Sequence, residues 1–306
     1  MTAMFRPAVL RIAEMPAVRR FVQENPASRS LVERFVAGET LDEAIDRSRA
    51  VARLGMSVTL DLLGDNVRAE TEARAAVDRY IGMFRRMAEA GLEPNISVKL
   101  TMLGLDIADS LAAEGLDRLL ATAREVSGFV RADMEGSAYT ARTLAIVGDA
   151  HARYPDEVGT VIQSCLHRSD ADIDWAIARG VRIRLVKGAY AEPAGIAWQD
   201  RESVDGAYIR QMERLLDAGR YPAIATHDAA IIRSARGYAL RMGIPGDRFE
   251  FQMLYGVRRD LQRELVREGC RMRIYVPYGR DWYPYFARRV AERPANALFV
   301  LRQFAG

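Results

Sequence analysis

The sequence predicts a parallel (β/α)8 barrel, and three observations favour this fold class. Eight short runs rich in β-branched and apolar residues follow one another along the chain. Each run is followed by a stretch with the apolar spacing of an amphipathic helix, as in consecutive β–α units. No two glycines are separated by a single residue, so the GxGxxG turn typical of nucleotide-binding open sheets is absent. A doubly wound open sheet is the alternative to a closed barrel.

The first part of the chain, residues 1–54, is expected to form a helical extension ahead of the barrel. Thr40 and Glu43 have the spacing of a capping box, in which each side chain accepts a hydrogen bond from the backbone of the other residue. Apolar residues then follow at helical spacing, at Leu41, Ala44, Ile45 and Val51. No linker-like Pro/Gly/Ser segment divides the remainder, so residues 55–306 are assigned to one barrel domain.

The eight predicted strands lie within residues 57–65, 95–101, 128–135, 159–166, 181–190, 223–228, 249–256 and 271–279. After the second run, for example, the helical spacing is carried by Leu111, Leu116, Leu119 and Leu120. Residues 281–292 are predicted to form a last helix, with Asp281 as its cap and Pro294 beyond its end. Because this helix starts at the barrel mouth, Arg288 and Arg289 on it can reach over the mouth.

Composition and charge exclude several classes of protein. The 306 residues are 49% apolar and 28% charged, with a net charge of +3. This is a globular composition without the basic surplus of a nucleic-acid-binding protein. Two isolated cysteines and three histidines, with no zinc spacing and no HExxH motif, predict neither a metal site nor a disulfide framework. No apolar stretch has the length of a membrane span and no signal peptide is recognisable, so we expect a cytoplasmic protein.

Lysine is almost absent, and both copies fall where an active site is expected. Of 44 basic residues only Lys99 and Lys187 are lysines. A site that needs a compact ammonium cannot take a planar guanidinium instead. Both lysines lie at carboxyl ends of predicted strands, which form the active-site end of a barrel. Other polar residues near these ends are Ser97, Arg131, Asp133, Glu135, Gln163, Ser164, Arg184, Tyr190, Thr226, His227, Asp228, Gln252, Tyr275 and Tyr278. Their convergence on one end of the barrel favours a functional site.

Each of these residues also has a purely structural interpretation. A single Asp or Gln at a strand end is often a hydrogen-bonded loop residue. Arg184 can serve as the partner of Asp133. His227 alone can be structural, and Gly188 can serve a tight turn. The arginine pair of the last helix can belong to a solvated face with a weak ion pair.

Five motifs, in order along the chain, together resemble the proline dehydrogenase family. They are RLVKGAY (184–190), ATHD (225–228), FEFQMLYG (249–256), RIYVPYG (273–279) and RRVAERPAN (288–296). The resemblance is greatest to the short, monofunctional bacterial type. It implies a distorted (β/α)8 barrel, with a last helix over its mouth, that binds FAD at the strand carboxyl ends without a Rossmann domain.

The resemblance also implies a reaction and the residues that perform it. The reaction is oxidation of L-proline to Δ1-pyrroline-5-carboxylate by hydride transfer to flavin N5, with electrons passed to a quinone at the inner face of the membrane. Catalytic roles are implied for Asp133 and Arg184. The implied substrate contacts are Lys99, Tyr275, Arg288 and Arg289. The implied FAD contacts are Met134, Gln163, Arg184, Val186, Lys187, Gly188, Ala189, Thr226, His227 and Gln252, and Glu292 matches a supporting position.

Two other functions stay open on the residues alone. A Schiff-base aldolase on the same barrel would use Lys99 or Lys187 as its amine. A barrel without catalytic activity would bind an anionic metabolite through Lys99, Arg288 and Arg289. A purified protein that is yellow with flavin absorbance would exclude both.

Overall fold

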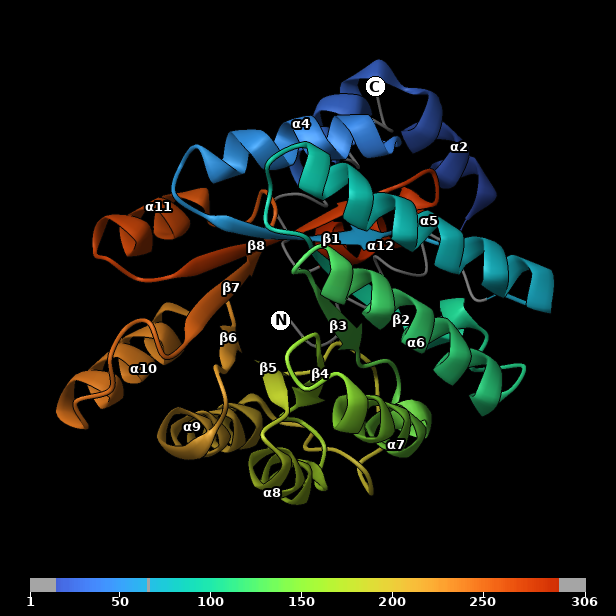
Figure 1. The fold of residues 1–306 in the computed structure, drawn as a ribbon. Helices are drawn as coiled ribbons and strands as arrows, with labels where there is room; N and C mark the ends of the chain where they lie inside the picture. The colour runs from blue at the N-terminus through green and yellow to red at the C-terminus, as the bar shows by residue number, and fades with distance from the viewer. Residues whose placement is uncertain (1–14, 65–66, 292–306) are drawn as a thin grey trace.

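The strands close into a parallel barrel, as the sequence predicts (Figure 1). This computed structural model describes residues 15–64 and 67–291. The strands pair in chain order, and β1 also pairs with β8, which closes the barrel and excludes an open sheet. They are β1 (Ser57–Leu62), β2 (Asn95–Lys99), β3 (Phe129–Asp133), β4 (Val158–Gln163), β5 (Arg182–Val186), β6 (Ala223–Ala225), β7 (Glu250–Leu254) and β8 (Met272–Tyr278).

Helices alternate with the strands and surround them (Figure 1). Those that follow strands β1 to β7 are α5 (Glu70–Glu89), α6 (Asp109–Glu125), α7 (Ser137–Arg153), α8 (Ser169–Arg179), α9 (Arg201–Ala218), α10 (Ala229–Arg241) and α11 (Arg259–Arg267). A short 3-10 helix, η1 (Leu100–Leu103), lies between β2 and α6. The barrel is preceded by α2 (Pro16–Glu24), α3 (Pro26–Phe35) and α4 (Leu41–Ala52), and it is followed by α12 (Trp282–Ala291).

The predicted strand runs mostly extend beyond the carboxyl ends of the observed strands. The fifth run continues to Tyr190, whereas β5 ends at Val186. Beyond that point Gly188 adopts a φ of +111°, which takes the chain out of the strand conformation. The sixth run similarly continues to Asp228, whereas β6 ends at Ala225. The extra residues are therefore loop residues at the barrel mouth.

The inside of the barrel is unusually polar. Arg184 on β5 hydrogen-bonds Ser97 on β2 and Gln252 on β7, which only a path through the interior allows. The apolar side chains that alternate with these residues, such as Leu60 and Val98, are fully buried in the large hydrophobic cluster shared with the helices. The core that stabilises the fold thus lies between sheet and helices, and the interior is left for charged and hydrogen-bonding groups.

The N-terminal helices support the barrel and its last helix. The predicted capping box at the start of α4 is confirmed: the Glu43 amide donates to Thr40 Oγ1 at 3.3 Å and the Thr40 amide donates to Glu43 Oε2 at 3.0 Å. Phe35 at the end of α3 shares an apolar cluster with Trp282 and Phe286 of α12. The predicted last helix, 281–292, is observed from Trp282 to Ala291, and Glu292 lies outside the described residues. The division of the chain at residues 54 and 55 stays a prediction.

Candidate active site

Arg184 is the centre of a hydrogen-bonded cluster inside the barrel. Its guanidinium donates to Asp133 Oδ1 at 2.6 Å, to Gln252 Oε1 at 2.5 Å and to Ser97 Oγ at 3.0 Å. Its side chain is only 5% exposed. It also lies over the Tyr275 ring, with 5.2 Å between the guanidinium carbon and the ring centroid. Residues of four other strands, β2, β3, β7 and β8, therefore hold this cation in one orientation.

Asp133 joins Arg184 to Tyr275. The Tyr275 hydroxyl donates to Asp133 Oδ2 at 2.8 Å, while Oδ1 takes the guanidinium. Burial raises the pKa of Asp133 above its ordinary value, although the charge of Arg184 opposes this shift and that of Asp61 adds to it. Burial also raises the pKa of Tyr275, and Asp133 is the nearest charge that adds to the effect. The tyrosine therefore stays protonated and donates its hydrogen bond across the working pH range.

Lys99 ends β2 beside the Asp133 cluster. Its ammonium donates to Asp61 Oδ1 at 3.2 Å, and Asp61 is buried within β1. Burial alone would lower the pKa of Lys99, but the charges of Asp61 and Asp133 together with the hydrogen bond to Asp61 raise it. Lys99 is thus a fixed cation. Asp61 is a residue that sequence reasoning missed, although its position two residues after Thr59, on the same face of a strand, was a signal.

The ends of β3 and β4 are joined by backbone and side-chain hydrogen bonds. Gln163 Nε2 donates to the Glu135 carbonyl at 2.8 Å, and the Glu135 carboxylate accepts from the Thr101 hydroxyl at 2.8 Å. Met134 lies beside them in a small apolar cluster with Val161, against which Val186 packs. This side of the mouth combines an apolar surface with an amide.

The loop after β5 starts with an ion-pair cluster. Lys187 Nζ contacts Asp205, and it lies 3.1 Å from Asp228 Oδ2. Arg201 pairs with the same two carboxylates, at 3.2 and 3.0 Å. The predicted cofactor residue Lys187, which Gly188 and Ala189 follow, is therefore anchored to α9 and to the start of α10. Asp228 was among the polar strand-end residues noted in the sequence, without a role, whereas Asp205 was not predicted.

Thr226 and His227, at the end of β6, have structural contacts. Thr226 Oγ1 accepts from the Asp228 amide at 3.1 Å, and His227 Nε2 accepts from the Leu254 amide at 3.0 Å. The second contact fixes the tautomer of His227 with its proton on Nδ1. These residues lie at the mouth, and these two hydrogen bonds join β6 to the start of α10 and to β7.

The arginine pair of α12 divides between two environments. Arg288 is exposed. Burial raises the pKa of Tyr190, and the charges of Lys99 and Arg288 oppose this shift. Arg289 is half-buried, with its guanidinium carbon 5.3 Å from the Tyr285 ring centroid. Arg288 and Lys99, which lie far apart in the chain, thus both act on the pKa of Tyr190.

Residues 15–64 and 67–291 contain neither a metal-binding cluster nor a membrane-spanning helix. No group of three or more His, Cys, Asp or Glu side chains is arranged to hold a metal ion. No helix within those ranges has both the length and the apolar composition needed to cross a bilayer.

A closed (β/α)8 barrel with a fixed cation and an acid–tyrosine pair at the carboxyl ends of its strands defines a barrel enzyme. The family model "Proline dehydrogenase" matches residues 44–302. The chain belongs to this family, whose members are oxidoreductases of proline catabolism.

Individual relatives agree with this assignment. The chain is 42% identical over 306 residues to a proline dehydrogenase of Deinococcus radiodurans, covering 98% of this chain and 97% of the relative. It is 38% identical over 299 residues to proline dehydrogenase 1 of Bacillus subtilis strain 168, covering 98% of both chains. A crystal structure of proline utilization A from Bdellovibrio bacteriovorus, inactivated by N-propargylglycine, superposes with a TM-score of 0.80 at 26% identity. That match covers 94% of this chain and 36% of the longer protein.

Proposed function

We propose that this chain catalyses the FAD-dependent oxidation of L-proline to Δ1-pyrroline-5-carboxylate. The observation that carries the proposal is the Lys99–Asp133–Arg184–Tyr275 cluster at the carboxyl ends of the strands, in a member of this family. When bound, FAD supplies the hydride acceptor at its N5 atom and passes the electrons to a quinone. We place the enzyme in the cytoplasm, meeting the quinone at the inner face of the membrane.

The residues at the mouth fit a flavin. Gly188 has a φ of +111° and lies so close to Cys165 that a Cβ there would collide with the sulfur, so the turn into the proposed flavin-binding loop requires glycine. The proposed contacts offer an amide at Gln163, a guanidinium at Arg184 and an apolar surface at Met134. These groups suit the carbonyls, ring nitrogens and flat ring of a flavin. The other proposed contacts are Val186, Lys187, Ala189, Thr226, His227 and Gln252.

The carboxylate of proline is expected to bind between Lys99 and the arginines of α12. Lys99 has three N–H donors and uses one of them on Asp61, which leaves two for a substrate carboxylate. Arg288 is proposed to face the same mouth, which its effect on the pKa of Tyr190 supports. Three cations around one carboxylate repel one another when the site is empty, so the substrate anion relieves the repulsion.

Arg184 and Tyr275 are proposed to set the reaction geometry. Arg184 keeps a positive charge beside the flavin, which favours the anionic reduced form of the ring. Tyr275 packs its ring against that of proline while its hydroxyl is held by Asp133 at 2.8 Å. Asp133 accepts hydrogen bonds from both residues and so fixes their relative orientation.

The contacts of the two lysines argue against a Schiff-base aldolase. A Schiff-base lysine needs a depressed pKa, as desolvation without a counter-ion provides. The pKa of Lys99 is instead raised, and Lys187 lies between two carboxylates.

The test is turnover of L-proline with a soluble quinone as acceptor, with the product trapped by o-aminobenzaldehyde. We expect trapped pyrroline-5-carboxylate in proportion to quinone reduced, and no covalent adduct after borohydride treatment with carbonyl substrates. Protein that reduces quinone without forming this product, or that is trapped by borohydride, would contradict the proposal.

A further inference from the structure

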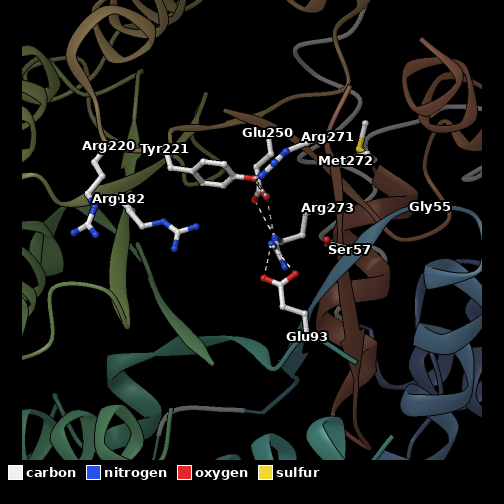
Figure 2. A pocket seen from close by; sticks show the side chains of 10 residues that line it. All are labelled: Gly55, Ser57, Glu93, Arg182, Arg220, Tyr221, Glu250, Arg271, Met272 and Arg273. Atoms are coloured by element: carbon white, nitrogen blue, oxygen red, sulfur yellow. Dashed lines mark hydrogen bonds and ion pairs between the residues drawn. The ribbon is translucent and has the colours of Figure 1, made fainter. Parts of the chain in front are cut away.

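A cavity of about 520 Å³ lies at the amino ends of the strands, the opposite end of the barrel from the candidate active site (Figure 2). Its lining comes from strand starts: Ser57 begins β1, Arg182 begins β5 and Met272 begins β8. We call it the floor cavity. Its volume is in the range of small-molecule sites.

Part of the charge around the floor cavity is already neutralised. Arg273 Nε lies 2.9 Å from Glu250 Oε1, and its terminal nitrogen lies 3.0 Å from Glu93 Oε1 (Figure 2). Arg220, at the other side of the cavity, pairs with Asp156. Both acidic groups of the lining, Glu93 and Glu250, therefore share one arginine, and Glu250 also accepts from the Tyr221 hydroxyl at 3.2 Å.

Two further arginines of the lining have no carboxylate partner within the described part of the chain. Arg182 stacks between Phe129 and Tyr221, with ring centroids 4.3 and 4.8 Å from its guanidinium carbon, and its Nε is buried without a hydrogen bond there. Arg271 lies over the same Tyr221 ring at 5.8 Å and donates to the hydroxyl at 3.4 Å. Figure 2 shows the guanidinium of Arg182 extending into the space below the Tyr221 ring.

A third cation lies behind this pair. Arg131 is buried, and its terminal nitrogen donates to the Thr160 carbonyl at 3.0 Å and to the Arg182 carbonyl. Burial lowers the pKa of Arg131, and the charges of Arg184 and Arg182 add to this shift. Glu250 and Asp133 oppose this shift without reversing it, and an anion placed beside Arg131 and Arg182 would further offset the cost of burying their charges.

We propose that the floor cavity binds a small dianionic oxyanion through Arg182 and Arg271. Four arginines line the cavity and Arg131 lies behind them. Glu93, Glu250 and Asp156 offset three of these five positive charges, which leaves two for an anion. The planar N–H forks of Arg182 and Arg271 each fit the oxygen pair of a phosphate or a carboxylate. A phosphate group and a dicarboxylate present this same chemistry, and the experiment below separates them. The site shares no lining residue with the candidate active site, so it stands whether or not the proposed reaction is correct.

The test is titration of the full-length protein with inorganic phosphate, and separately with malonate, at constant ionic strength. Calorimetry should show saturable binding of one anion per chain for at least one of the two probes, and the melting temperature should rise with its concentration. Arg271→Gln and Arg182→Gln should each weaken that binding about tenfold or more.

The matched control is Arg241→Gln, because Arg241 is exposed and stacks on Tyr238 at 5.7 Å, much as Arg271 stacks on Tyr221. This variant should bind the anion as the wild type does. Arg271 is exposed, so its replacement leaves the buried packing intact even if Arg182→Gln fails to fold. Saturable binding of phosphate alone assigns the site to phosphate groups, and of malonate alone to dicarboxylates. Absence of saturable binding for both, or equal affinity in wild type and Arg271→Gln, would overturn the proposal.

Discussion

Replacing Arg184 by methionine should destabilise the protein through the carboxylate that it leaves behind. The side chains of Asp133 and Arg184 are 15% and 5% exposed, and Asp133 Oδ1 lies 2.6 Å from the Arg184 guanidinium. Removal of the cation therefore leaves a buried, uncompensated charge. Breaking such a pair costs about 3–5 kcal/mol. At about 2.1 cal/mol/K per residue, unfolding 306 residues has an entropy of about 0.64 kcal/mol/K. The expected fall in melting temperature is therefore about 5–8 °C.

The pH dependence of this variant has a definite sign. The pKa of Asp133 is already raised in the folded protein, and loss of Arg184 raises it further. A carboxyl group whose folded pKa exceeds its unfolded value of about 3.9 lowers stability as pH rises through that window. The difference in folding stability between wild type and Arg184→Met should therefore shrink as the pH falls towards about 4 and grow towards neutrality.

Calorimetric melting across this pH range tests the reasoning, with Arg184→Met combined with Asp133→Asn as the matched variant. The double variant carries no buried charge at either position, so it should be more stable at neutral pH than Arg184→Met alone. Destabilisation of Arg184→Met that is independent of pH, or that is fully additive with Asp133→Asn, would refute the account.

Three further predictions concern the mouth of the barrel. Tyr275→Ser should improve the use of hydroxyproline relative to proline, measured as a ratio of kcat/KM values, because it opens space beside the ring. Arg288→Ala, Arg289→Ala and Lys99→Ala should each raise the apparent Kd for proline about tens-fold or more, with FAD content little changed, because a desolvated charge contact typically matters by about 2–5 kcal/mol. Gly188→Ala should release FAD during gel filtration, because its φ of +111° and the crowding at its Cβ position disfavour any side chain.

Controls and adverse results for these three predictions are equally specific. An unchanged ratio in Tyr275→Ser removes the screening role of that ring. Arg118→Ala, which breaks an exposed ion pair between α6 and Asp78 of α5, is the control for the carboxylate contacts. If the arginine and lysine variants lose FAD but keep their affinity for proline, these residues hold the cofactor instead. Full retention of FAD by Gly188→Ala would show that the conformation of this turn does not control FAD binding.

The sequence predicted the barrel well because its signals are periodic. Strand and helix patterns alternate regularly, and the observed barrel puts β1 beside both β2 and β8, as closure requires. The strand ends were less predictable. Loop residues such as Tyr190 and Asp228 continue the sequence pattern of the strands before them. Only the hydrogen bonds between neighbouring strands show that β5 ends at Val186 and β6 at Ala225.

The partners of the site residues were harder to predict than the residues themselves. Lys99 and Asp133 could be selected from their places at strand ends, but the pairing of Lys99 with Asp61 depends on the register of β1 against β2. The floor cavity was not predicted either. In an arginine-rich sequence nothing distinguishes Arg182 and Arg271 from the other arginines. The structure places both beside Tyr221, without a carboxylate partner among the described residues.

Anaerobic mixing of the purified protein with L-proline, followed by visible absorption, tests the central claim most directly. The account predicts a yellow protein whose flavin absorption bleaches when proline alone is added and returns when a quinone is admitted. A protein that neither contains nor binds FAD, or a bound flavin that stays oxidised in excess L-proline, would contradict it.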